Sequence, residues 1–238
     1  MFGAVLQTAR ATFGYFGNSA ISNFAFRISN PSVGTTTDTH SKSDHSVLVR
    51  PLSYVERLNL HGLFPQRQPI EIELGAGDGS FIAQWAALNR QTNFLAVERL
   101  LGRLRKIERK SHRAGLTNLR ALRLEASYFA EFLLPADSVA AFHIYFPDPW
   151  PKRKHRGNRL INERFAEVLR TALRRDGIVY LRTDDLDYFG QMRRSFEVNK
   201  HFEATATPER LSSVVTDFER TFNAEGIQTN RAAYRRVA

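Results

Sequence analysis

The sequence predicts an α/β fold in which a parallel sheet is covered by helices on both faces. From about residue 70, short apolar runs alternate with segments of helical periodicity, and several runs are too continuously apolar to have one face in water. Strict alternation of strand and helix produces right-handed crossovers and therefore a parallel sheet. Ligands of such sheets bind beyond the carboxyl ends of the strands, so we expect the functional residues in the loops that follow them.

The expected strands are short apolar runs, each followed by a turn or a helical segment. In chain order they are IEIEL (70–74), NFLAVE (93–98), LRALRLE (119–125), VAAFHIYF (139–146) and GIVYLRT (177–183).

Two of the intervening helices are predicted from an apolar stripe and a residue that can cap it. We expect one helix to begin after Ser80, with its apolar stripe over residues 81–88. We expect another to begin after Asn158, with its stripe over residues 160–173. These helices would connect neighbouring parallel strands.

The chain divides by composition into a short first part and a folded remainder. Residues 1–45 mix Gly, Ser, Thr, Asn and Phe without a sustained period, so we expect a poorly ordered leader or linker there. Residues 46–238 are expected to form one domain, and a hydrophobic content of 42% is enough for a sizeable core.

Composition narrows the classes of partner and of bound ligand that the chain can have. The formal charge of +10 favours a polyanion, with RNA or DNA ahead of an anionic membrane, because neutralising phosphates releases counterions. The absence of cysteine excludes disulfides and thiolate zinc sites. The histidines show no metal-ligand spacing, and no apolar run approaches the roughly 18 residues of a membrane span. We therefore expect no metal, no membrane and a cytoplasmic location.

A glycine-rich turn follows the first predicted strand. Gly75, Gly77 and Gly79 stand at every second position, where they let the backbone turn tightly and approach a ligand. Ser80 occupies the place where a dinucleotide fingerprint needs its third glycine, which disfavours NAD. The alternative is that the glycines only form a strand-to-helix turn.

Acidic residues at the ends of three strands indicate which ligand this turn holds. Glu73 leads into the turn, where a carboxylate repels a pyrophosphate but suits the α-ammonium of S-adenosylmethionine. Glu98 ends the second strand, where an acid can accept hydrogen bonds from ribose hydroxyls. Glu125 ends the third strand and is a further candidate near the adenine. The sequence therefore predicts an S-adenosylmethionine site.

The stretch FPDPWPKRKHRGNR (146–159) follows the fourth strand. Its prolines restrict the backbone, so Asp148 is held with little freedom, and Trp150 can stack or pack. A run of cations follows that can contact phosphates: Lys152, Arg153, Lys154, His155, Arg156 and Arg159. A structural turn followed by a solvated charge run is the alternative interpretation. The combination of a rigid acid, cations and a glycine turn at one sheet edge favours a nucleic-acid substrate.

The chain resembles the bacterial single-chain tRNA (guanine-N7)-methyltransferases. The motifs that carry the resemblance are ELGAGDG and FPDPWPK with the basic segment after it, and the resemblance covers the chain from about Leu63 to the C-terminus. The resemblance implies a Rossmann-like class I methyltransferase fold with a mostly parallel seven-stranded sheet. It implies S-adenosylmethionine as donor, a variable-loop guanine of tRNA as acceptor, and a monomer or weak homodimer without an obligate protein partner.

The resemblance also implies roles for individual residues. The residues expected to contact the donor are Glu73, Gly75, Gly77, Glu98, Glu125 and Asp148, of which Asp148 is also the expected catalytic residue. Those expected to contact the substrate are Lys152, Asp184, Thr216, Phe218 and Glu219. Two positions depart from the family: Asp217 replaces a lysine, and Glu125 stands where aspartate is usual.

Other functions remain open at this point. The same donor site could serve methyl transfer to another RNA position or, less readily given the cations, to a small molecule. A non-catalytic RNA-binding module is the alternative from another class. It would not need Glu73, Glu98 and Asp148 together with the three glycines.

Overall fold

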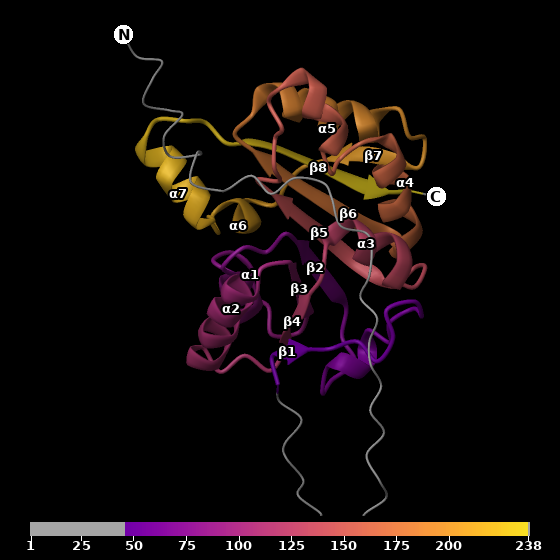
Figure 1. Ribbon diagram of the computed structural model, residues 1–238, viewed down its shortest axis with the longest axis vertical. Coiled ribbons are helices and arrows are strands. Elements are labelled where there is room, and N and C mark those ends of the chain that lie inside the picture. Colours follow the sequence, from indigo (N-terminus) through magenta and orange to yellow (C-terminus); the bar gives the residue numbers. More distant parts are fainter. Residues whose placement is uncertain (1–45, 238) are drawn as a thin grey trace, which may run out of the picture. The chain divides into compact units, whose positions relative to one another are not determined.

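The computed structural model describes residues 46–237, so the leader or linker expected over residues 1–45 lies outside the described residues. The described part contains one eight-stranded sheet in the order β1-β4-β3-β2-β5-β6-β8-β7 (Figure 1). The strands are β1 (Leu48–Val49), β2 (Ile70–Leu74), β3 (Asn93–Glu98), β4 (Leu119–Arg123), β5 (Val139–Tyr145), β6 (Leu173–Thr183), β7 (Phe202–Thr205) and β8 (Asn230–Arg236).

The sheet is parallel from β1 to β6, and β8 lies antiparallel between β6 and β7. The predicted α/β fold with a mostly parallel sheet is therefore confirmed. The sheet has one strand more than the seven that the resemblance implies, because the two residues of β1 add an edge beside β4.

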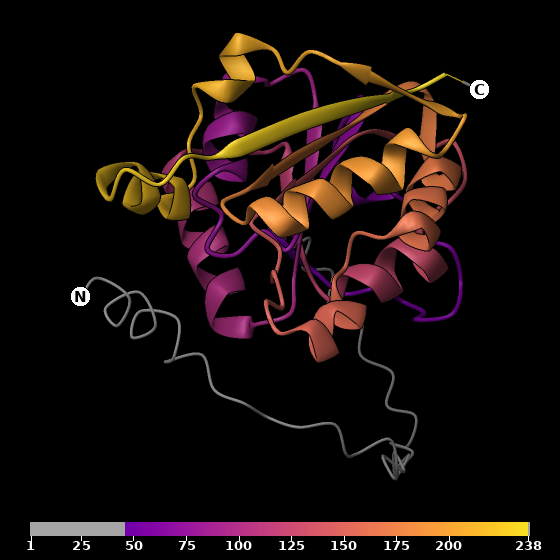
Figure 2. The ribbon, with the colours of Figure 1, turned by 90° about the horizontal axis from the view of Figure 1, so that it is seen from above.

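Helices cover both faces of this sheet. The α-helices are α1 (Ile82–Leu88), α2 (Leu101–Arg113), α3 (Ala126–Tyr128), α4 (Glu163–Ala172), α5 (Leu186–Glu197), α6 (Glu209–Ser212) and α7 (Asp217–Ala224). The described residues also form two 3₁₀-helices, η1 (His61–Leu63) and η3 (Arg153–Asn158), and one π-helix, η2 (Phe129–Leu133). Seen from above, α1 and α2 lie on one side of the strands and α4 on the other (Figure 2).

The predicted helix starts are wrong at both caps. The helix α4 is capped by Asn162, whose side chain accepts a hydrogen bond from the Phe165 amide at 3.0 Å, because Asn158 already belongs to η3. Ser80 makes no cap for α1. Its hydroxyl instead accepts the amide of Asp217 at 3.0 Å, a partner distant in the chain.

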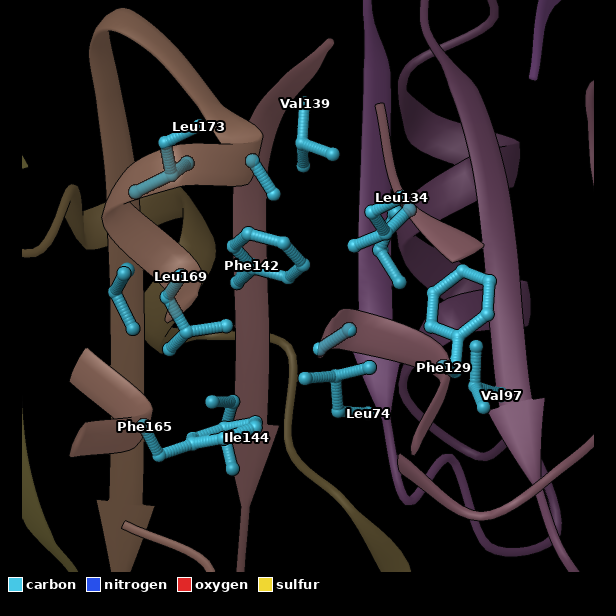
Figure 3. Packing of buried hydrophobic residues seen from close by; sticks show 14 of the residues in the cluster. Leu74, Val97, Phe129, Leu134, Val139, Phe142, Ile144, Phe165, Leu169 and Leu173 are labelled. Carbon is cyan, nitrogen blue, oxygen red and sulfur yellow. The ribbon is translucent and has the colours of Figure 1, made fainter. Parts of the chain in front are cut away.

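Alternation along the strands divides the core between the two faces. One cluster fills the space beneath α4 and α5, where Phe142 of β5 lies between Leu169 and Leu173 on one side and Leu134 on the other (Figure 3). The second cluster lies beneath α1 and α2 and includes Phe81 and Leu104. The second face also carries the buried acids of β2 and β3, so the site develops there.

Candidate active site

The glycine turn has the left-handed backbone that only glycine adopts without strain. Gly75, Gly77 and Gly79 have φ angles of 77°, 56° and 76°. A Cβ added at Gly75 or Gly77 would meet nothing within 4 Å, so open space lies over this part of the turn. At Gly79 it would lie 2.7 Å from Cγ1 of Ile107, because α2 packs directly against the turn.

Glu73 is the last residue but one of β2, just before this turn, and is buried, with 3% of its surface exposed. Its Oε2 has no hydrogen-bond partner among the described residues. Burial raises the pKa of the Glu73 carboxyl well above its ordinary value, and the positive charge of Arg182 offsets only part of that effect. The Ile82 backbone also donates a hydrogen bond to this carboxyl. A buried carboxyl oxygen without a partner is costly, so this position is suited to a cation that a ligand would bring.

Glu98 ends β3, and its carboxylate is held by two backbone amides. Its carboxylate accepts the amide of Gly77 at 3.0 Å and that of Leu100 at 2.8 Å. Arg103 lies 3.8 Å from the same carboxylate. Because a carboxylate offers about four lone-pair sites, it can accept hydroxyl groups in addition.

Glu125 caps α3. Its oxygens accept the amides of Ser127 at 2.9 Å and Tyr128 at 2.7 Å, and the residue is exposed. The predicted contact of Glu125 with the donor stays a prediction.

The loop after β5 combines an unusual backbone with a buried anchor. Phe146 and Trp150 have positive φ angles of 51° and 44°, which bulky residues rarely adopt and which cluster at functional sites. Arg159, 3% exposed, donates from Nε to the Pro149 carbonyl at 2.7 Å and from Nη2 to Asp187 at 2.6 Å. The expected phosphate contact of Arg159 is thus replaced by a role in holding this loop on α5.

Asp148 and Lys152 lie exposed on the loop that Arg159 holds. The strands β2 and β5 are parallel neighbours, so the glycine turn and the Asp148 loop leave the same edge of the sheet side by side. Asp184 follows β6, the next strand along this edge, and is half-buried. The structure therefore gathers these three side chains at one edge, and their catalytic and binding roles stay predictions.

Two of the three residues predicted to contact the substrate at α7, Thr216 and Glu219, are buried and make structural contacts. Thr216 caps α7 in a reciprocal arrangement with Glu219, whose buried carboxylate also pairs with Arg182 at 2.9 Å and with Arg231. Phe218 is 51% exposed, and its ring centroid lies 6.3 Å from that of Phe146. Substrate contact by Thr216, Phe218 and Glu219 stays a prediction, and Phe218 is the most accessible of the three.

Asp217, where the resemblance implies lysine, begins α7 and contacts residues inside and outside this helix. Its side chain forms an ion pair with Arg220, and its amide donates to Ser80 of the glycine turn. Arg220, the cation three residues further along α7, is thus engaged with Asp217.

Arg182 organises this region, and sequence reasoning missed it. It is 1% exposed and donates to the carbonyls of Val214 at 2.7 Å and Leu211 at 2.6 Å. Its guanidinium lies 4.3 Å from the ring centroid of Tyr145. The only sequence signal is a charged residue that interrupts the apolar run of the fifth predicted strand.

A second buried polar group lies deeper on the same face. His143 contacts the Tyr145 hydroxyl at 2.8 Å and Glu71 at 2.9 Å. Burial raises the pKa of Glu71, but hydrogen bonding and the charge of His143 outweigh it, so the pKa lies below its ordinary value. These partners satisfy one another, in contrast to Glu73.

Within residues 46–237, no helix is long and apolar enough to cross a membrane, and no three His, Asp or Glu side chains are grouped as a metal site. A cytoplasmic location and a monomeric or weakly dimeric state stay predictions.

Sequence comparison places the chain among methyltransferases. Residues 67–232 match the family model described as "Putative methyltransferase". A tRNA (guanine-N(7)-)-methyltransferase of Chromohalobacter salexigens is 35% identical over 153 residues, which are 64% of this chain and 62% of the relative. One of Geobacter metallireducens is 33% identical over 181 residues, 74% of this chain and 86% of the relative. The chain spans less than two thirds of the first relative's length, and 60% and 56% of two others.

Structural comparison supports the fold. The crystal structure of the 16S rRNA methyltransferase KamB is similar with a TM-score of 0.53 at 17% identity, covering 73% of this chain and 90% of that one. Because the family model spans well over half of the chain and the Geobacter relative exceeds 30% identity across most of its length, the chain belongs to the tRNA (guanine-N7)-methyltransferase family.

Proposed function

We propose that this protein transfers a methyl group from S-adenosylmethionine to N7 of a guanine in tRNA. The observation that carries the proposal is the buried carboxyl of Glu73 at a glycine turn, whose Oε2 has no hydrogen-bond partner among the described residues, one strand away from the exposed acid Asp148. The names of the relatives support the choice of acceptor.

The residues at the turn fit the donor. Glu73 would pair with its α-ammonium, which satisfies the orphaned Oε2. Glu98 would accept hydrogen bonds from the ribose hydroxyls of the donor. The open space over Gly75 and Gly77 would admit the part of the donor that lies against the backbone of the turn. When bound, the donor supplies an electrophilic methyl group on its sulfonium.

Methyl transfer to guanine N7 requires the protein mainly to align the base with the methyl group. Guanine N7 carries an in-plane lone pair and no proton, so no general base has to remove one, and catalysis rests on positioning and electrostatics. A cation at N7 would occupy the reacting lone pair. A carboxylate that accepts from N1–H and the N2 amino group would hold the base by its opposite edge and stabilise the positive charge that develops.

Asp148 is the residue that suits this role. It is exposed, its loop is fixed by Arg159, and it lies beside the donor turn at the same edge of the sheet. Asp184, at the end of the neighbouring strand, would assist, and Lys152 would contact a flanking phosphate. The guanine would leave its stack to reach the two acids.

Methyl transfer from labelled donor to tRNA transcripts tests the proposal. Transcripts with and without a variable-loop guanine are compared, and the label is mapped by base-specific cleavage. We expect N7-methylguanine only in transcripts that keep this guanine. Label at another RNA position would favour the alternative acceptor, and binding of tRNA without retention of S-adenosylmethionine would identify a non-catalytic RNA-binding module.

A further inference from the structure

The helix α2 carries an unusual density of positive charge. Its sequence LGRLRKIERKSHR contains one acid, Glu108, against Lys or Arg at positions 103, 105, 106, 109, 110 and 113. Leu104, Ile107 and Ser111 are buried against the sheet. Because a helix turns every 3.6 residues, the opposite side presents Arg105, Arg109 and Arg113 at intervals of four residues, or roughly 6 Å. We call these three exposed arginines the α2 arginine row.

Two cations on the flank of α2 that faces the glycine turn are paired. Arg103 lies 3.8 Å from Glu98, and Lys110 lies 2.8 Å from Asp78. The α2 arginine row differs, because none of its members pairs with an acid among residues 46–237. Arginines on the opposite face of the sheet, such as Arg164 and Arg193, have such partners.

Helix stability does not account for the row. Like charges four residues apart destabilise a helix by about 0.2–0.5 kcal/mol per pair. Arg105 is the fifth residue of α2 and Arg109 the ninth, so neither lies in the last turn, where the helix dipole favours a cation. Only Arg113, in the last turn, has the favourable position. The row therefore lowers the stability of the free protein, and a bound polyanion would neutralise this repulsion.

The place of α2 in the fold connects the row to the donor site. Ile107 packs on Gly79 and Lys110 holds Asp78, so α2 lies against the glycine turn, beside α1 (Figure 1). The helix links β3 to β4, whereas the basic loop with Lys152 follows β5. In the sheet order, β3 and β5 flank β2. The helix α2 and the Lys152 loop therefore lie on opposite sides of β2, the strand that leads into the glycine turn.

We propose that the α2 arginine row binds backbone phosphates of the same tRNA and forms a second contact surface across the donor turn from the Lys152 loop. This inference rests on the proposed function, because the RNA is its acceptor. The row would supply affinity and orientation without reading sequence, as phosphate contacts do.

The test is tRNA binding by the variant Arg105→Gln/Arg109→Gln/Arg113→Gln over a range of salt concentrations. Each phosphate contact contributes about −0.9 to the slope of log K against log salt on duplex and about −0.7 on single strands. We expect the slope to become shallower by about 2–3 and KM for tRNA to rise at least about tenfold, with kcat at saturating tRNA and the affinity for S-adenosylmethionine unchanged.

Two control variants separate the row from net charge and from helix structure. Arg67, Arg175 and Lys200 are exposed at the amino ends of β2, β6 and β7, and their replacement by Gln removes the same charge from the other edge of the sheet. This control should leave the slope within about one unit of the wild type. The triple Arg→Lys variant of the row should retain most of the slope, because lysine keeps the charge.

Equal loss of slope in the row variant and the control, or no loss in the row variant, would overturn the inference. If the wild type methylates tRNA while the row variant behaves identically, only the row inference fails. If the wild type transfers no methyl group to any tRNA, the proposed function fails first.

Discussion

Glu73 is the residue at which the proposed donor binding should be coupled most directly to protein stability. Its carboxyl is buried without a partner for Oε2, and its pKa is raised by burial. Between the unfolded pKa and this raised folded pKa, the native state binds more protons than the unfolded state. The free energy of unfolding therefore falls as pH rises through that range.

We expect Glu73→Gln to raise the stability of the ligand-free protein at pH 7 and to weaken donor binding by at least about tenfold, since it removes both the burial cost and the charge partner of the ammonium. Melting temperature should rise by about 2–4 °C per kcal/mol gained. The gain should shrink as pH falls toward the ordinary carboxyl pKa of 4.5 and vanish below it, where the unfolded carboxyl is also protonated. Thermal unfolding and calorimetric binding measure the two effects, and unchanged donor affinity would contradict the assignment.

Donor binding by the wild type should in turn tighten as pH rises toward 7.5, because Glu73 must ionise to pair with a cation. Below about pH 7.5 an α-amino group with a pKa of about 7.7–8.0 stays largely protonated, so the trend reports the protein. Titration calorimetry from pH 5.5 to 7.5 measures it, with Glu73→Gln as the control. A trend that is identical in the variant would show that another group titrates.

Asp148→Asn should keep tRNA binding and lose most turnover, by about 10²-fold or more, because the amide cannot accept from both donors of the guanine edge or stabilise its positive charge. Single-turnover methylation at saturating tRNA measures the loss. Lys152→Ala is the contrasting variant, since it should weaken tRNA binding and flatten the salt slope by about one unit. A normal methylation rate in Asp148→Asn would remove this residue from the chemistry.

The placement of candidate site residues could be predicted where their position in the α/β pattern is informative. Glu73, Glu98 and Asp148 each lie at or just beyond the carboxyl end of a strand, and the structure gathers them at one edge of the sheet, whereas their roles stay predictions. Arg182 and Arg159 could not be found this way, because a cation in a sequence does not reveal whether it is buried. Their roles depend on carbonyls and acids that only the fold brings near.

At the scale of elements, the glycine turn and α2 form one packed unit. Gly79 has a left-handed backbone, and Ile107 of α2 lies against it. The sequence pattern located the turn because three alternating glycines precede a helix. It could not indicate that the third glycine is required for contact with α2.

We expect Gly79→Ala to destabilise the protein by about 2 kcal/mol or more, since the left-handed conformation alone costs about 1–2 kcal/mol with a Cβ and the contact with Ile107 adds to it. Gly102→Ala is the matched control in α2, where an added Cβ meets nothing. It should stabilise by about 0.5–1 kcal/mol. Urea unfolding of both variants measures the difference, and equal effects would contradict this packing.

Element boundaries were least predictable where a cap competes with a neighbouring turn. Asn158 and Asn162 both precede the apolar stripe of α4, and the choice between them depends on η3, a short turn with no periodic signal. The strand β6 begins at Leu173 rather than 177, because Leu173 pairs with Val139 before the register shifts. Such irregular pairing leaves no trace in an apolar pattern.

For the molecule as a whole, the order of strands decides where the chemistry can occur. The chain runs from β2 toward β4 on one side of the sheet and then returns to β5 on the other side of β2. The glycine turn follows β2 and the Asp148 loop follows β5, at the point where the direction reverses. The parallel fold predicted this edge as the ligand site, whereas the position of α7 against Ser80 and Phe146 emerges only in three dimensions.

The crystal structure of the protein with S-adenosylhomocysteine tests the central claim most directly, because that product keeps the ammonium and the ribose of the donor. We predict its ammonium within about 2.7–3.2 Å of a Glu73 oxygen, its ribose hydroxyls at Glu98, and its sulfur facing the Asp148 loop. A ligand bound away from the glycine turn, or a Glu73 carboxyl that stays unpaired in the complex, would contradict the account.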